Sequence, residues 1–202
     1  MHVPKINEMA DIHEITDFMK RYSFATVISI QDNIPVATHL PFVVTSLNNE
    51  IKLYSHFGKA NPQWKGIEAG SVLVIFSEPH AYISPANYEH TLNVPTWNYI
   101  AVHVYGQAKI IEEGKDVLNI LENTIDFYED AYKSQWNELP QTFKEKMIKG
   151  IVAFEVNISD IQAKKKLSQN KTKQEQEKII TSLSESVFDN EKIIAEYMSK
   201  EL

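Results

Sequence analysis

The stretch Trp97-Asn98-Tyr99-Ile100-Ala101-Val102-His103-Val104-Tyr105 carries the clearest strand pattern in the chain. Alternate side chains of a strand point to opposite faces of a sheet, so this stretch has two faces of different character. One face is aliphatic and typical of a core. The other face is aromatic with polar tips, which favours a planar ligand or a subunit interface, or else a second packed face of the sheet. The aromatic face consists of Trp97, Tyr99, Ala101, His103 and Tyr105.

This stretch belongs to a strand-like run at 97–112, and further strand-like runs lie on both sides of it, at 23–30, 34–45, 50–57, 71–76, 81–84 and 150–158. Turn-forming residues at 31–33 and 47–49 predict hairpins between the first three runs. Helical spacing of apolar residues predicts helices at 11–22, 115–133 and 140–149, and two more in the C-terminal tail. Many strands with few internal helices indicate a mainly β protein, an antiparallel barrel with peripheral helices.

The composition of the 202 residues narrows the classes of function. Hydrophobic residues make up 43%, which is enough for a sizeable core. Cysteine is absent, so a disulfide framework, a thiolate zinc site and a cysteine nucleophile are excluded. The net charge of −7 argues against general attraction to nucleic acid phosphates. Because no apolar run has membrane-spanning length and no signal segment is evident, we expect a cytoplasmic protein that does not enter a membrane.

The C-terminal segment differs in character from the rest of the chain. It begins with a lysine-rich run, Lys164-Lys165-Lys166-Leu167-Ser168-Gln169-Asn170-Lys171, and continues into two helices. Such a run is usually a solvated linker, but its charge would also suit a phosphate or DNA. We therefore expect a barrel domain at residues 1–162, and a basic segment with C-terminal helices at 163–202 that packs on the barrel or on a dimer partner. Asp11 with Glu14, and Thr172 with Glu175, match the capping-box spacing of helix starts.

Few residues point to catalysis or to a metal. Four histidines lie on or beside separate predicted strands, without the helical spacing of a zinc hydrolase: His39, His56, His80 and His103. No Gly-x-Ser-x-Gly elbow occurs, and we predict neither a metal site nor a catalytic residue. Ser55 and Lys59 flank a glycine turn before a helix start, where a hydroxyl, an ammonium and free backbone N–H groups together can hold a phosphate.

Five motifs occur in order from near the start of the chain to its tail. They are Pro35-Val36-Ala37-Thr38-His39-Leu40-Pro41-Phe42, Lys59-Ala60-Asn61-Pro62-Gln63-Trp64, Pro79-His80-Ala81-Tyr82-Ile83-Ser84-Pro85, Val94-Pro95-Thr96-Trp97-Asn98-Tyr99 continuing to Val102-His103-Val104-Tyr105-Gly106, and Lys166-Leu167-Ser168-Gln169-Asn170. In this order they resemble the PaiB-like family of FMN-binding split barrels, whose members are known as FMN-binding negative transcriptional regulators. The resemblance covers most of the chain.

The resemblance implies a six-stranded antiparallel split β-barrel, related to pyridoxamine-phosphate oxidases and flavin reductases, in a homodimer with FMN at the interface. It also implies a regulator that represses protease and sporulation genes and senses flavin or redox state. DNA would be contacted through the lysine-rich tail or through a partner protein. The residues that the resemblance assigns to the cofactor are Thr38, His39, Ser55, His56, Lys59, His80, Trp97, Asn98, Lys166, Gln169 and Asn170.

Three departures from the family pattern keep other functions open. Lys59 and Lys171 stand where the family usually has Arg, and lysine keeps the charge but loses the bidentate fork. Glu78 stands where the family tends to have Gly, and a carboxylate there would repel an anionic cofactor. Ala86-Asn87-Tyr88 stands where the family tends to have Ser-Trp-Tyr, so one stacking surface is lost. The alternatives are a flavin-dependent oxidoreductase, a haem-binding or haem-degrading split-barrel enzyme, and a structural dimer whose cofactor site is empty.

Overall fold

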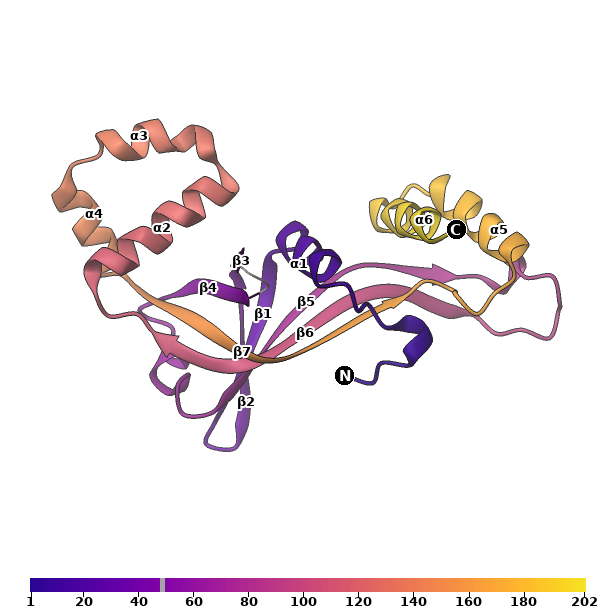
Figure 1. Cartoon of the computed structure of the whole chain (residues 1–202), viewed down its shortest axis with the longest axis horizontal. Helices are drawn as coiled ribbons and strands as arrows, with labels where there is room; N and C mark the ends of the chain where they lie inside the picture. Colours follow the sequence, from indigo (N-terminus) through magenta and orange to yellow (C-terminus); the bar gives the residue numbers. More distant parts are fainter. Residues whose placement is uncertain (48–49) are drawn as a thin grey trace. The chain divides into compact units, whose positions relative to one another are not determined.

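The computed structural model describes residues 1–47 and 50–202 (Figure 1). The protein is mainly β, with helices at both ends of the chain and between the last two strands. The strands are β1 (Phe24–Gln31), β2 (Ile34–Pro41), β3 (Val43–Leu47), β4 (Glu50–Gly58), β5 (Ser71–Ile83), β6 (Thr96–Ile110) and β7 (Ile151–Lys166). The α-helices are α1 (Ile12–Arg21), α2 (Gly114–Tyr128), α3 (Lys133–Glu138), α4 (Gln141–Ile148), α5 (Lys173–Ser184) and α6 (Asp189–Glu201). Short 3-10 helices are η1 (Lys5–Asn7), η2 (Pro62–Gly66), η3 (Pro85–Asn87) and η4 (Asp130–Tyr132).

The sheet has seven strands, which corrects the six-stranded barrel that the resemblance implied. Its strand order is β2-β1-β5-β6-β7-β4-β3, so in the described residues β2 and β3 are edges and the sheet is not closed. The predicted run 34–45 divides into two strands at Pro41 and Phe42. Pro41 has no N–H to continue the ladder, and the N–H of the buried Phe42 donates instead to the carbonyl of Ser23 at 2.8 Å. The runs 71–76 and 81–84 belong to one long strand, β5.

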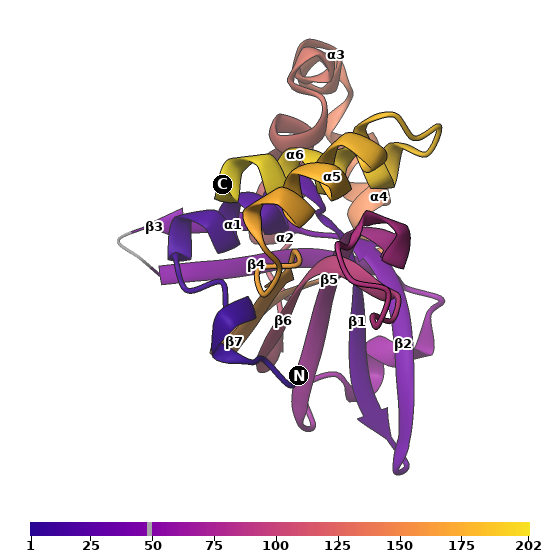
Figure 2. The ribbon, with the colours of Figure 1, turned by 90° about the vertical axis from the view of Figure 1, so that its right-hand side faces the viewer.

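β1 and β2 form an antiparallel hairpin (Figure 2). The register pairs Gln31 with Ile34, which leaves a two-residue turn. The turn residues Asp32 and Asn33 have φ angles of 51° and 61°, a left-handed conformation that Asp and Asn tolerate well. The predicted turn at 31–33 is thereby confirmed. The predicted turn at 47–49 includes residues 48 and 49, which lie outside the described residues.

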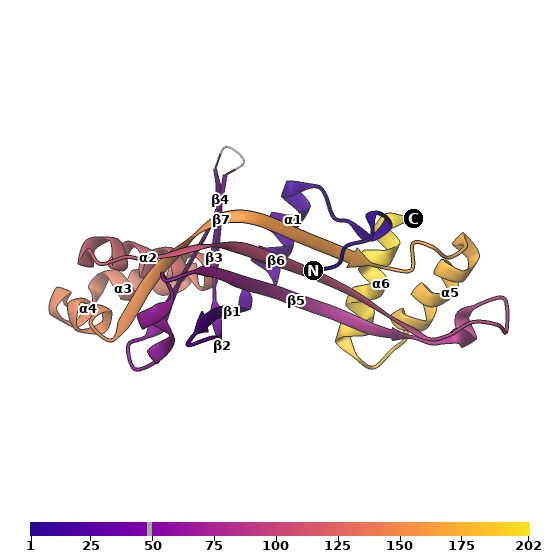
Figure 3. The same cartoon turned by 90° about the horizontal axis from the view of Figure 1, so that it is seen from below.

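The chain divides into two compact units, and each is described by itself. The first unit comprises Met1–Ile15, Ser77–Val102 and Gln162–Leu202, and the second comprises Thr16–Phe76 and His103–Ile161. The long strands β5, β6 and β7, neighbours in the sheet, contribute residues to both units (Figure 3). Over residues 1–47 and 50–202, no helix is both long enough and apolar enough to cross a membrane.

Phenylalanines build the core of the second unit. Phe57 on β4 and Phe154 on β7 stack with ring centroids 4.9 Å apart, and Phe42 meets Phe154 edge-on at 6.1 Å. All three are fully buried, and each contributes roughly 1.5–3 kcal/mol through removal of its side chain from water. This packing fixes the end of β4, where Ser55 and His56 lie just before Phe57.

In the first unit, α5 and α6 pack side by side (Figures 1 and 2). The predicted capping box at the start of α5 is confirmed. The Thr172 hydroxyl accepts the N–H of Glu175 at 3.2 Å, and the Glu175 carboxylate accepts the N–H of Thr172 at 3.3 Å. The apolar stripe predicted for the last helix is also present, because Ile194 and Met198 of α6 are fully buried.

Candidate functional site

Gln63 organises the polar residues of the second unit around Thr38. Its side chain is fully buried, and its amide nitrogen donates to the carbonyls of Val27 at 3.3 Å and Val36 at 3.1 Å. Its amide oxygen accepts the hydroxyl of Thr38 at 2.6 Å. Asn61 accepts the N–H of Gln63 and donates its own amide to the Thr38 oxygen, both at 2.9 Å. The network joins β1, β2 and η2, so Thr38 is held firmly in place.

His39 and Ser55 are also held by hydrogen bonds within this unit. The His39 ring is bonded through Nδ1 to the Thr26 hydroxyl at 2.8 Å and stacks on Phe24 at a centroid distance of 6.4 Å. Ser55 is buried, and its hydroxyl donates to the carbonyl of Pro41 at 2.7 Å. A serine has one hydroxyl proton, so Ser55 would have to release Pro41 before it could donate to a phosphate.

Lys59 is the exposed lysine among the residues of the second unit that the resemblance assigns to the cofactor. Its N–H donates to the carbonyl of Gly150 at 2.8 Å, and its carbonyl accepts the indole N–H of Trp64 at 3.0 Å. These bonds fix the backbone of the turn and leave the ammonium in solvent. Burial lowers the pKa of His56, so this imidazole adds no second charge at neutral pH.

Three aromatic rings form an exposed cluster in the first unit, the aromatic platform of His80, Tyr82 and Trp97. The Trp97 ring on β6 lies 5.8 Å from both of the other rings, which belong to β5. The exposed fractions are 52% for Trp97 and 45% for Tyr82, so two large aromatic side chains lie open to solvent side by side. Glu78, the carboxylate that departs from the family pattern, lies 3.8 Å from His80 Nδ1 and pairs with the imidazole when it is protonated.

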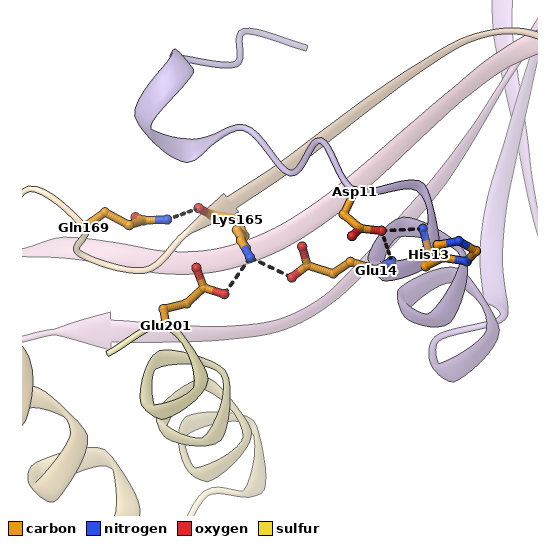
Figure 4. A network of polar contacts seen from close by, with 6 residues as sticks. All are labelled: Asp11, His13, Glu14, Lys165, Gln169 and Glu201. Atoms are coloured by element: carbon orange, nitrogen blue, oxygen red, sulfur yellow. Dashed lines mark hydrogen bonds and ion pairs between the residues drawn. The ribbon is translucent and has the colours of Figure 1, made fainter.

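The lysine-rich run forms the end of β7 and the turn after it, not a solvated linker. Lys164 is buried, with its ammonium 5.2 Å from the ring centroid of Tyr99. Lys165 donates to Glu14 at 2.7 Å and to Glu201 at 2.6 Å (Figure 4). Burial by itself lowers the pKa of Lys165, but hydrogen bonds to the two carboxylates outweigh burial and raise it. Lys165 thus joins the start of α1 to the end of α6.

Lys166 supports the backbone beneath the aromatic platform. Its ammonium donates to the carbonyl of Trp97 at 2.8 Å and to the hydroxyl of Thr96. Burial lowers the pKa of Lys166, and the neighbouring charge of Lys164 acts in the same direction. Within the described part of the chain, Lys166 has no carboxylate partner, so its charge is not neutralised.

The turn after β7 is fixed by polar side chains. Ser168, with a φ of 60°, donates its hydroxyl to the side-chain oxygen of Asn98 at 3.0 Å. Asn98 is fully buried and donates to the sulfur of Met198 at 3.4 Å. Gln169 bonds to the backbone of its own turn through both ends of its amide, at 2.7 and 2.6 Å. Asn98 and Gln169 therefore support the local structure, whereas Asn170 is exposed.

The residues that the resemblance assigns to the cofactor fall into two groups, one in each unit. The second unit contains Thr38, His39, Ser55, His56 and Lys59, and the first contains His80, Trp97, Asn98, Lys166, Gln169 and Asn170. Sequence reasoning missed the role of Gln63, because a glutamine carries no pattern that signals burial. It also missed the pairing of Lys171 with the ring of Tyr88, at 3.7 Å from the centroid. No group of three or more metal-binding side chains occurs at 1–47 and 50–202.

Comparison with known proteins agrees with the motifs. Residues 1–160 match the family model described as "Putative FMN-binding domain". The chain is 38% identical over 205 residues to the "Protease synthase and sporulation protein PAI 2" of Bacillus subtilis (strain 168). That alignment covers 100% of this chain and 98% of the relative.

Solved structures share the fold at low sequence identity. The flavocytochrome Anf3 from Azotobacter vinelandii has a TM-score of 0.64 at 17% identity, over 82% of this chain and 72% of that one. The FAD and heme binding protein from Mycobacterium smegmatis has a TM-score of 0.63 at 15% identity, over 79% and 73%. These likenesses concern the fold alone. The family match and the full-length relative show that the chain belongs to the PaiB-like family of FMN-binding-domain proteins.

Proposed function

We propose that this protein binds FMN, with the flavin ring on the aromatic platform of the first unit. The observation that carries the proposal is the exposure of Trp97 and Tyr82 next to each other. Stacking of a flat heteroaromatic ring on such side chains buries apolar area and favours defined ring geometry. A bound flavin would supply electron-transfer chemistry.

The charges around the platform support an electron-rich ligand. Lys166 lacks a carboxylate partner in the described residues and donates to the carbonyl of Trp97 at 2.8 Å. Glu78, whose carboxylate lies 3.8 Å from the His80 ring, opposes this effect. A nearby cation such as Lys166 favours anions and the reduced form of a bound redox group. The residues present therefore fit a flavin.

This proposal gives the segment 163–202 a part in the cofactor site. Lys166 supports Trp97, and Ser168 holds Asn98 in the next position of β6. Residues 163–202 would then contribute to the cofactor site. A segment that folded as a domain of its own, away from the platform, would not do so.

We further propose that the flavin-bound protein is a homodimeric regulator of protease and sporulation genes. The support is the 38% identity, over the whole chain, to a relative named for protease synthesis and sporulation. Two of the lysines expected to reach DNA have other partners, because Lys164 lies over the ring of Tyr99 and Lys165 binds two carboxylates. This favours regulation through a partner protein. Sedimentation in the presence and absence of FMN tests the dimer, and protease transcript levels in a deletion strain test the regulation.

The flavin proposal is tested by titration of riboflavin and FMN into flavin-free protein, with flavin fluorescence as the signal. Trp97→Ala is expected to weaken both flavins about tenfold, since stacking on an aromatic side chain is worth ~1–3 kcal/mol. Phe188→Ala is the matched control, because Phe188 is an exposed aromatic of the same unit (66%) outside the platform. Equal affinities for wild type and Trp97→Ala would refute the platform as the flavin site.

A further inference from the structure

A small cavity of about 220 Å³ lies in the first unit, between the loop before β6 and the turn after β7. Lys166 and Lys171 line it, together with Tyr88, Thr96 and Asn170. Pockets for drug-sized ligands are roughly 300–1,000 Å³, so this cavity suits a smaller group. Two ammonium groups, a hydroxyl and an amide give it the donors that an anion requires.

Lys171 is held in a fixed position at this cavity. Its ammonium lies 3.7 Å from the centroid of the Tyr88 ring and donates to the side-chain oxygen of Asn93 at 2.8 Å. Tyr88 is only 8% exposed, and its buried hydroxyl has no hydrogen-bond partner in the part of the chain that the structure describes. Burial, aided by the charge of Glu175, raises the pKa of Tyr88, so the phenol stays neutral. The ring therefore forms a stable cation–π support for Lys171.

Neither lysine of the cavity has a carboxylate partner among residues 1–47 and 50–202. Lys165, the residue before Lys166, shows the contrast, because it binds two carboxylates. The pKa of Glu175 is lowered by the backbone N–H of Glu89 and, to a smaller extent, by the charge of Lys171. The carboxylate of Glu175 accepts that N–H at 3.0 Å and keeps its negative charge, which interacts with Lys171 without a direct ion pair. The cavity is therefore lined by two partly buried ammonium groups that form no direct ion pair with a carboxylate of the described residues.

We propose that this cavity binds a phosphate group, as inorganic phosphate or as the end of a small phosphomonoester. A phosphate monoester carries about −1.5 to −2 charges at pH 7, which matches the two ammonium groups. Its oxygens accept charge-assisted hydrogen bonds from both lysines and ordinary ones from Thr96 and Asn170. The site goes beyond the proposed flavin role because it adds Lys171, which takes no part in the aromatic platform, to Lys166, which also supports Trp97.

The test is calorimetric titration of inorganic phosphate and of methyl phosphate into flavin-free protein, at constant ionic strength set with chloride. Flavin-free protein is used so that a failure of flavin binding leaves this measurement intact. Lys171→Gln is expected to weaken phosphate binding about tenfold or more, since a hydrogen bond to a charged group is lost. Lys171→Arg, which keeps the charge, is expected to stay within about threefold of wild type. Lys173→Gln is the matched control, because Lys173 is an exposed lysine two residues away that does not line the cavity.

Each outcome decides the proposal. Binding that Lys171→Gln weakens and Lys173→Gln leaves unchanged supports it, and preference for methyl phosphate over inorganic phosphate identifies an ester as the ligand. No heat above the chloride control, or equal loss in both glutamine variants, overturns it. A third titration repeats the phosphate measurement with saturating FMN or riboflavin. If FMN weakens phosphate binding and riboflavin does not, the cavity holds the phosphate of the flavin itself. That result would overturn the proposal of a separate phosphate site.

Discussion

Replacement of Gln63 by leucine tests whether the polar network of the second unit is a structural requirement. Gln63→Leu keeps nearly the same volume but removes every side-chain hydrogen bond of a fully buried residue. The carbonyls of Val27 and Val36 and the hydroxyl of Ser29 each lose a donor, and the hydroxyl of Thr38 loses its acceptor. A neutral hydrogen bond contributes a net ~1 kcal/mol, and a buried group left unsatisfied costs about 1–3 kcal/mol. The four losses, partly relieved by relaxation, are expected to lower the free energy of unfolding by about 3 kcal/mol.

Urea denaturation followed by tryptophan fluorescence measures this effect. With an m-value in the range of 1–3 kcal/mol/M, the midpoint is expected to fall by roughly 1 M or more, with little change in the slope. Gln107→Leu is the matched control, because Gln107 is exposed and makes one hydrogen bond, at 2.6 Å to the carbonyl of Glu68. Its expected loss is below about 1 kcal/mol. If the two variants lose the same stability, the network around Gln63 does not have the role assigned to it.

Three further predictions concern other parts of the chain. Gly106→Ala places a Cβ 2.4 Å from the carbonyl oxygen of Asn157 on β7, so thermal unfolding should show a loss of about 1–3 kcal/mol, and an unchanged melting temperature would contradict this contact. The pKa of Glu175 is lowered chiefly by a backbone hydrogen bond. Its contribution to stability is therefore present above the unfolded pKa of 4.5 and is lost as the pH falls through the lower folded value, so amides at the start of α5 should lose hydrogen-exchange protection as the pH falls below 4.5. Lys165→Met leaves two carboxylates facing each other, and hydrogen exchange should become faster at the end of α6, whereas Lys173→Met should leave it unchanged.

Local structure could be predicted from sequence where the signal lies within a few residues. The Asp11 carboxylate caps α1 by accepting the N–H groups of His13 at 2.7 Å and Glu14 at 3.2 Å, as the spacing predicts (Figure 4). In a complete capping box the Glu14 carboxylate would also accept the N–H of Asp11, but here it binds Lys165 instead. Thr172 keeps both halves of its box. The two boxes differ because Glu14 has a partner far away in the sequence, Lys165, which the spacing of Asp11 and Glu14 cannot reveal.

The remaining features depend on contacts between distant residues. The lysine-rich run reads as a solvated linker because charge runs usually are, yet its lysines meet Tyr99, two glutamates and the backbone of Trp97. The run 34–45 reads as one strand, because its apolar pattern continues through the break at Pro41. For the aromatic face of 97–105 the sequence left open a ligand surface, a subunit interface and a second packed face. In the structure Trp97 is exposed, whereas Ala101 of the same face is buried. The contribution of Tyr82 to that surface follows from the pairing of β5 with β6, which the sequence does not specify.

The most direct test of the flavin proposal is an absorbance spectrum of the purified protein after incubation with excess FMN and removal of free ligand. The account predicts that the visible flavin bands remain with the protein in stoichiometric amount, and that Trp97→Ala loses most of them. A spectrum without flavin bands, or one with a Soret band acquired from haem in place of flavin, would contradict the central claim.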